Sequence, residues 1–239
     1  MTPSGTNPES GFGNKLLFDI GAFEGQNATL FAKRGWRVVA LEPNPARFAV
    51  LQAKLRDFEK TGCVALQAAC GPENGVATLH LATVNLETLC TMSSGWRDAV
   101  QASGRFPGKN WPKSTVVKQV TLDHLILQYG TPDMILIDAE GYESQILAGL
   151  SVKVPEVVFE WHAEWLPDAI TSCKMLTALG AYRFNYALGE HALVLPKYLH
   201  FAEFLEKLKK VVEQPMNWGM VYSLTGRGVK DHYGGGAWR

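Results

Sequence analysis

The sequence predicts a doubly wound α/β fold, in which a mostly parallel sheet carries helices on both faces and ends in an antiparallel strand. Short apolar runs rich in β-branched residues alternate with segments of helical periodicity through most of the chain. Such alternation is typical of a parallel sheet. Near the C-terminus the stretch YRFNYALGEHALVL predicts a hairpin around Gly189, which indicates antiparallel pairing there.

The elements are expected in the following order. Strands are predicted at residues 16–20, 37–41, 63–68, 77–81, 116–120, 134–138, 156–160 and 221–224, besides the hairpin. Helices are predicted at residues 26–34, 45–59, 122–129, 143–150, 168–179 and 201–212. The strand at 77–81 is expected to pair locally with the strand at 63–68.

Length and composition agree with one large domain, because 239 residues, 46% of them hydrophobic, suffice for a sizeable core. We expect this domain to span residues 15–228. Residues 1–14 are polar and rich in Pro and Gly, and residues 229–239 are rich in glycine, so a flexible arm and a flexible tail are predicted. The arm lacks the apolar stretch of a signal peptide.

Charge and cysteine content limit the partners and the cellular location that we expect for the protein. Lys and Arg together number 23, as do Asp and Glu, and a formal net charge of zero argues against nucleic acid and acidic membranes as partners. No apolar run approaches the length of a membrane span. The four cysteines show neither CxxC nor metal-ligand spacing, so reduced thiols and a cytoplasmic protein are expected. The oligomeric state does not follow from the sequence.

Residues 83–115 interrupt the alternation and are predicted to form an irregular insertion. Within it, residues 91–115 carry a local charge of +3 with interleaved aromatic side chains. Long irregular segments in compact domains often act as lids or binding loops. A substrate lid and a solvated surface insertion both agree with this pattern, and the sequence does not decide between them.

The loop after the first strand has the pattern Asp-x-Gly-x-x-x-Gly, with Asp19, Gly21 and Gly25 at its fixed positions. The glycines let the backbone approach a ligand closely. Glu42 follows the next strand at a spacing suited to the ribose hydroxyls of an adenosine-containing ligand. An anionic pyrophosphate would be poorly placed beside Asp19 and Glu24, whereas a cation would be favoured. S-adenosylmethionine therefore fits better than NAD.

Asp138, Glu140, Glu160 and His162 follow two neighbouring predicted strands. Residues two apart on an extended segment point to the same side, so each pair is expected to face one cleft. A carboxylate or the imidazole could remove a proton from an acceptor hydroxyl. Three alternatives stay open: Asp138 as a helix cap, His162 as a hydrogen-bonded residue at the core edge, and all four as ligands of a divalent metal.

The stretches FDIGAFEGQ, ALEPNPARFAVL, VTLDHL, ILIDAEGYESQILAGL and VVFEWH, in order within residues 17–162, resemble the FkbM-type methyltransferases of the class I, Rossmann-like fold. The resemblance implies a seven-stranded sheet with a reversed last strand and S-adenosylmethionine as cofactor. The chain departs from the usual pattern at Phe23 and Glu24, which affects the substrate more than the cofactor.

These considerations give the expected site, with no resident metal. The cofactor is expected to contact Asp19, Gly21, Ala22, Glu24, Gly25, Glu42, Pro43 and Asp138. The catalytic residues are expected to be Asp138, Glu140, Glu160 and His162.

The sequence favours O-methylation of a hydroxyl on a small molecule or glycan. Methylation of nucleic acid or protein is an alternative, although the chain lacks the Asn/Asp-Pro-Pro-aromatic loop that grips a flipped base. A non-catalytic scaffold that binds S-adenosylmethionine is a further alternative. The acidic pair Asp138 and Glu140 argues against it, because a degenerate site need not keep both.

Overall fold

The structure is a computed structural model that describes residues 15–83, 87–189, 191–212 and 217–226. The predicted arm 1–14 and tail 229–239 lie outside these ranges. The strands of the main sheet are β1 (Leu16–Ile20), β2 (Arg37–Leu41), β3 (Val64–Leu66), β7 (Met134–Ile137), β8 (Glu156–His162), β9 (Tyr182–Tyr186) and β10 (Trp218–Thr225). The helices that cover it are α1 (Gln26–Lys33), α2 (Pro45–Leu55), α4 (Leu122–Tyr129), α5 (Glu143–Leu147), α6 (Leu166–Leu179) and α7 (Phe201–Val212).

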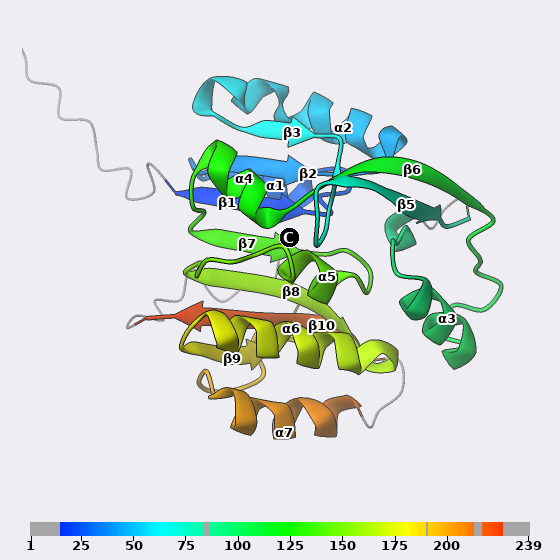
Figure 1. The fold of residues 1–239 in the computed structure, drawn as a ribbon, viewed down its shortest axis with the longest axis vertical. Coiled ribbons are helices and arrows are strands. Elements are labelled where there is room, and N and C mark those ends of the chain that lie inside the picture. The colour runs from blue at the N-terminus through cyan, green and yellow to red at the C-terminus, as the bar shows by residue number, and fades with distance from the viewer. Residues whose placement is uncertain (1–14, 84–86, 190, 213–216, 227–239) are drawn as a thin grey trace, which may run out of the picture.

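The seven strands lie in the order β3-β2-β1-β7-β8-β10-β9 (Figure 1). The five strands from β3 to β8 in this order run parallel, and β10 is antiparallel to both β8 and β9. The predicted doubly wound, mostly parallel sheet with a reversed last strand is confirmed.

The sheet is buried on both faces, which explains why its strands are nearly continuous apolar runs. Within β1, Phe18 and Ile20 pack in one core with residues of α4, α5, α6 and α7, and these helices lie in front of the sheet in Figure 1. Leu17 packs in the other core with residues of α1 and α2. None of the helices in the described ranges combines the length and apolar character needed to cross a bilayer.

A second sheet of three strands corrects one prediction. It consists of β4 (Ala69–Cys70), β6 (Lys113–Val120) and β5 (Gly75–Leu81), in that order. The segment 77–81 therefore does not pair with 63–68; its partner is β6, with which it forms an antiparallel ladder. The three residues of β3 offer only a short edge, whereas the ladder of β5 and β6 pairs seven residues with seven.

Residues 83–115, predicted to be irregular, contain regular structure. The turn η2 (Glu87–Leu89) and helix α3 (Ser94–Ser103) lie within it, and β6 begins at its end. The Ser93 hydroxyl accepts the backbone N–H of Trp96, and the helix ends at Gly104 in the left-handed conformation. Both capping residues can be recognised in the sequence, but the many polar residues between them hide the helical periodicity of the apolar ones.

The predicted C-terminal hairpin forms only in part. Strand β9 is its first arm, but residues after Gly189 contribute only two isolated antiparallel bridges, between Ala187 and Leu193 and between Phe184 and Leu199. The partner of β9 is instead β10, over five residue pairs. The expected antiparallel pairing is present, with a partner more distant in sequence.

The loops after β1 and β7 touch at the point where the strand order reverses, which is where open α/β sheets bind ligands. Gly21 lies there with φ of +81°, and a Cβ added to it would lie 1.8 Å from the carbonyl oxygen of Asp138. Only glycine allows this approach of two backbones.

We predict that Gly21→Ala lowers the free energy of unfolding by about 2–4 kcal/mol, because it adds overpacking to the cost of a positive φ. Gly35→Ala is the matched control, since Gly35 has φ of +84° with no atom within 4 Å of the added Cβ. The control should lose only about 1 kcal/mol. Urea unfolding measures both, and equal losses would contradict the argument.

Candidate functional site

A cavity of about 500 Å³ opens at the carboxyl ends of β1, β2 and β7. Its wall on the main sheet includes Asp19, Gly21, Ala22, Glu42, Pro43, Asp138 and Glu140. The facing wall includes Ala69, Cys70, Leu79, Thr88, Cys90, Thr91 and Met92. The second sheet and the segment between β5 and α3 therefore enclose the side of the cavity that could not be predicted from the sequence.

Asp19 is buried on β1, with a carboxyl group that is only partly compensated. It accepts the backbone N–H of Ala28 in the first turn of α1, where the helix dipole favours negative charge. Its Oδ2 atom is buried and has no hydrogen-bond partner. Burial, together with the charge of Asp138, raises the pKa of Asp19 to about 7.

Glu42 ties two loops together at the end of β2. Its Oε2 atom accepts the backbone N–H of Phe23 at 2.9 Å, and Oε1 accepts that of Asn44 at 2.7 Å. Burial raises the pKa of Glu42 to about 7, although these two hydrogen bonds oppose the shift. Each oxygen keeps a lone pair, so the carboxylate can accept further donors from a ligand.

Two predicted cofactor residues do not line the cavity. The carboxylate of Glu24 accepts a hydrogen bond from Arg47 at 2.6 Å and lies 3.8 Å from Lys54, both on α2. Gly25 faces the side chain of Leu51, which would lie 2.6 Å from an added Cβ. Both residues thus join the loop after β1 to α2.

The loop after β7 holds a strained residue in a fixed position. Glu140 has φ of +52°, which is uncommon for a residue other than glycine. Its carbonyl accepts the Thr91 hydroxyl at 2.7 Å, and Oε1 of Glu143 accepts the N–H groups of Ala139 and Gly141 on either side. Because these contacts determine the backbone, the side chain of Glu140 has a defined direction.

Glu143 lies in the first turn of α5, where the helix dipole favours its negative charge, and it also makes buried contacts. It is buried, and it shares a hydrogen bond with Asp168, which also accepts the N–H of Ser144. Burial raises the pKa of both carboxyl groups above their ordinary values. This hydrogen-bonded pair holds the loop after β7 in place. Asp138 does not cap α5, whose N-cap is Tyr142.

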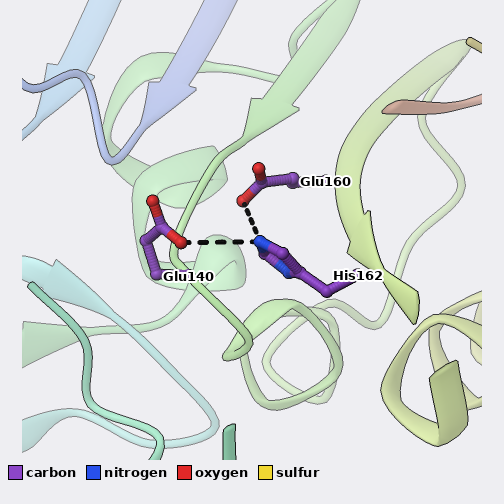
Figure 2. Close-up of side chains that lie close together, drawn as sticks. All are labelled: Glu140, Glu160 and His162. Carbon is purple, nitrogen blue, oxygen red and sulfur yellow. Dashed lines mark ion pairs between the residues drawn. The ribbon is translucent and has the colours of Figure 1, made fainter. Parts of the chain in front are cut away.

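Glu140, Glu160 and His162 meet in one cluster, with both carboxylates directed at the imidazole (Figure 2). Nε2 of His162 lies 3.4 Å from Oε2 of Glu160 and 3.5 Å from Oε2 of Glu140. Asp138 joins the cluster through a hydrogen bond with Glu160, and its own side chain is exposed. The structure thus brings together the four residues predicted to be catalytic, although Glu160 and His162 lie behind Glu140 and do not line the cavity.

Burial lowers the pKa of His162, but the negative charges of Glu160 and Glu140 outweigh it, and the net pKa lies well above the ordinary value. Burial raises the pKa of Glu140 and Glu160. A protonated imidazole has no lone pair with which to accept a proton. Among the four residues, the exposed carboxyl group of Asp138 is best placed to meet an acceptor in the cavity.

Helix α3 covers the cluster, a contact that sequence reasoning missed. Trp96 is fully buried, with its ring 5.2 Å from that of His162 and 5.9 Å from that of Trp111. A Cβ on Gly141 would lie 2.2 Å from the Trp96 ring, so glycine is required where the helix meets the loop. Trp165, which follows β8, donates its indole N–H to the carbonyl of Gly141.

Ion pairs neutralise part of the +3 segment 91–115. Arg97 pairs with Asp98 at 3.0 Å. Arg105 lies 3.2 Å from Glu164 in a nearly buried contact, and its guanidinium stacks 5.0 Å from the ring of Phe106. Arg105 therefore connects this segment to the rest of the protein, whereas Arg97 pairs within the segment.

A family model described as the methyltransferase FkbM domain matches residues 19–207. No curated protein sequence matches the chain significantly. Three solved structures illustrate the structural similarity. The precorrin-6y C5,15-methyltransferase of Geobacter metallireducens has 12% identity and a TM-score of 0.44, covering 90% of this chain and 82% of that one.

The O-methyltransferase of Bacillus cereus in complex with S-adenosylhomocysteine has 10% identity and a TM-score of 0.44, covering 89% of this chain and 74% of that one. The O-methyltransferase TomG of Streptomyces achromogenes, in complex with S-adenosylmethionine, has 12% identity, a TM-score of 0.41 and the same coverage. At these TM-scores the similarity carries no inference about the substrate.

We predict that the free energy of unfolding of the wild type falls more steeply between pH 5 and 8 than that of Asp19→Asn. Asp19 in the folded state keeps its proton to about pH 7, whereas in the unfolded state it loses it near pH 4. The folded state binds more protons in this window, so stability decreases as the pH rises. The variant should gain on the order of 3 kcal/mol relative to the wild type at pH 8. Urea unfolding at several pH values tests this, and parallel pH profiles would contradict it.

Proposed function

Since the chain belongs to the methyltransferase FkbM domain family and is an S-adenosylmethionine-dependent methyltransferase, we propose that it methylates a hydroxyl group of a small molecule or glycan. The observation that carries the proposal is the cavity, which brings Asp19, Glu42 and the exposed Asp138 into one space. A carboxylate beside the site of the methyl donor suits a substrate hydroxyl that must lose its proton during the transfer.

The residues present fit the cofactor. S-adenosylmethionine supplies a methyl group on a sulfonium sulfur, which makes that methyl electrophilic. The buried, unpartnered oxygen of Asp19 offers a cationic ligand a charge to pair with. Gly21 lets the loop after β1 approach the carbonyl of Asp138 at the wall of the cavity, and Glu42 lines the cavity with a carboxylate that can accept ribose hydroxyls. We assign the same cofactor site to Ala22 and Pro43, but not to Glu24 and Gly25.

In the proposed reaction the chain orients the acceptor and removes its proton. Methyl transfer is an in-line displacement, for which positioning can contribute about 7–11 kcal/mol. The carboxylate of Asp138 takes the hydroxyl proton as the oxygen attacks. Glu140, Glu160 and His162 position Asp138, through the loop that Glu140 shares with it and through the hydrogen bond between Asp138 and Glu160.

The segment 83–115 belongs to this proposal as the wall that contacts the acceptor. Thr91 and Met92 line the cavity, and α3 behind them is held by Trp96. Glu164 neutralises the charge of Arg105 in this segment, and the formal net charge of the whole chain is zero, which favours a small molecule or glycan over nucleic acid. A cytoplasmic location remains part of the proposal, and all four cysteines are free thiols.

We predict that the wild type binds S-adenosylmethionine and S-adenosylhomocysteine at micromolar concentration and does not bind NAD. Glu42→Gln should weaken both adenosyl ligands about 10–100-fold, because hydrogen bonds to a charged group contribute about 1.5–3 kcal/mol. Glu156→Gln is the matched control, a buried glutamate at the opposite edge of the sheet. Calorimetric titration of the wild type and both variants with the three ligands measures these affinities, and tight binding of NAD would overturn the cofactor assignment.

We predict that Asp138→Asn lowers kcat about 10²–10⁴-fold while the affinity for S-adenosylhomocysteine changes little. The assay follows labelled methyl groups from S-adenosylmethionine into hydroxylated small molecules and sugars. Asp123→Asn serves as control, since Asp123 accepts the N–H of Ser151 and does not line the cavity. Full activity of Asp138→Asn would exclude it as the base, and transfer only to nucleic acid or protein would overturn the proposed acceptor class.

A further inference from the structure

The cluster of Glu140, Glu160 and His162 is not explained by hydrogen bonding alone. Nε2 of the imidazole can carry one proton, yet carboxylate oxygens from both glutamates face it at 3.4 and 3.5 Å. A charge-assisted N–H···O bond is about 2.7–2.9 Å long, so neither contact reaches hydrogen-bond length. Both oxygens are buried and have no hydrogen-bond partner. Glu160 is only 5% exposed, so water does not compensate its charge.

The spacing of the three atoms is that of ligands around one ion. One ligand atom from each of Glu140, Glu160 and His162 lies within 4.8 Å of the other two. Around a divalent ion with bonds of about 2.1 Å, neighbouring ligand atoms are separated by about 3.0–3.4 Å. The two printed contacts to the imidazole are close to that range. A small shift of the side chains would therefore close the site around a cation.

We infer that Glu140, Glu160 and His162 form a binding site for a divalent transition metal ion. Two carboxylates and one imidazole are ligands that suit Mn²⁺, Fe²⁺ or Zn²⁺ better than Mg²⁺ or Ca²⁺, which prefer oxygen alone. The ion takes the position between the three atoms and balances two buried negative charges.

The surroundings hold this site in shape and give it access. The backbone of Glu140 is fixed by Thr91, and the imidazole of His162 is held against the ring of Trp96. Glu140 lines the cavity, which provides a path for the ion and an open coordination side. Asp138 also borders the cavity and is hydrogen-bonded to Glu160, so it lies next to the ion.

The consequence for catalysis rests on the proposed function, whereas the metal site itself does not. An ion at the edge of the cavity would bind the acceptor hydroxyl oxygen and fix it beside Asp138. Acceptors with two adjacent oxygens, such as vicinal diols, would then be preferred, because they can chelate the ion.

The experiment measures binding of Mn²⁺ alone to the full chain after chelator treatment, with neither acceptor nor methyl transfer involved. Titration followed by the EPR signal of free Mn²⁺ should show one equivalent bound. Glu160→Gln and Glu140→Gln should each weaken binding at least tenfold. Glu164→Gln is the matched control, a nearly buried glutamate two residues after His162 whose carboxylate pairs with Arg105.

Pulsed EPR of the bound ion keeps the test independent of how the variants fold. In the wild type, Mn²⁺ should show coupling to one imidazole nitrogen. S-adenosylhomocysteine binding reports whether each variant retains the cofactor cavity. No Mn²⁺ binding by the wild type, binding without nitrogen coupling, or unchanged affinity in both cluster variants would each overturn the inference. None of these outcomes affects the proposed O-methylation, whose failure would appear only in the acceptor assay.

Discussion

The burial of carboxyl groups at the carboxyl edge of the sheet is the constraint on which the site depends. Asp19, Glu42 and Asp138 interact electrostatically with one another at one wall of the cavity, and burial disfavours the charged form of the first two. Backbone N–H groups from Ala28, Phe23 and Asn44 offset part of this cost. The result is a cavity wall lined by carboxyl groups, an arrangement that is stabilised when a cation enters it and that repels a pyrophosphate.

The loop after β7 meets the same constraint by rigidity. Glu140 is held in a left-handed conformation that costs on the order of 1 kcal/mol or more, and its neighbours offset this through hydrogen bonds from Thr91 and to Glu143. The resulting direction of the side chain is what brings Glu140 to His162, which lies on another strand. Strain in the loop and the meeting of the two carboxylates are thus one feature of the structure.

Local pattern was sufficient for the part of the site that the parallel sheet builds. Asp19, Glu42, Asp138 and Glu160 each lie at or near the end of an apolar run, and topology alone brings such positions to one edge. The sequence could not reveal that Glu24 turns toward Arg47, because that choice depends on where α2 packs. Nor could it reveal the buried pair of Glu143 and Asp168, whose members come from different helices.

The facing wall of the cavity could not be predicted from the sequence for a related reason. It is built by β4, β5, β6 and the segment before α3, whose positions follow from pairing between residues about 40 apart in sequence. The main sheet determines the cofactor half of the cavity through strand ends that any fold of this class must place together. The other half depends on the contacts of Trp96 with Gly141 and His162. Changes in α3 can therefore reshape the acceptor side without disturbing the strand ends. Under the proposed function, acceptor specificity is therefore assigned to the segment with the weakest local signal in the sequence.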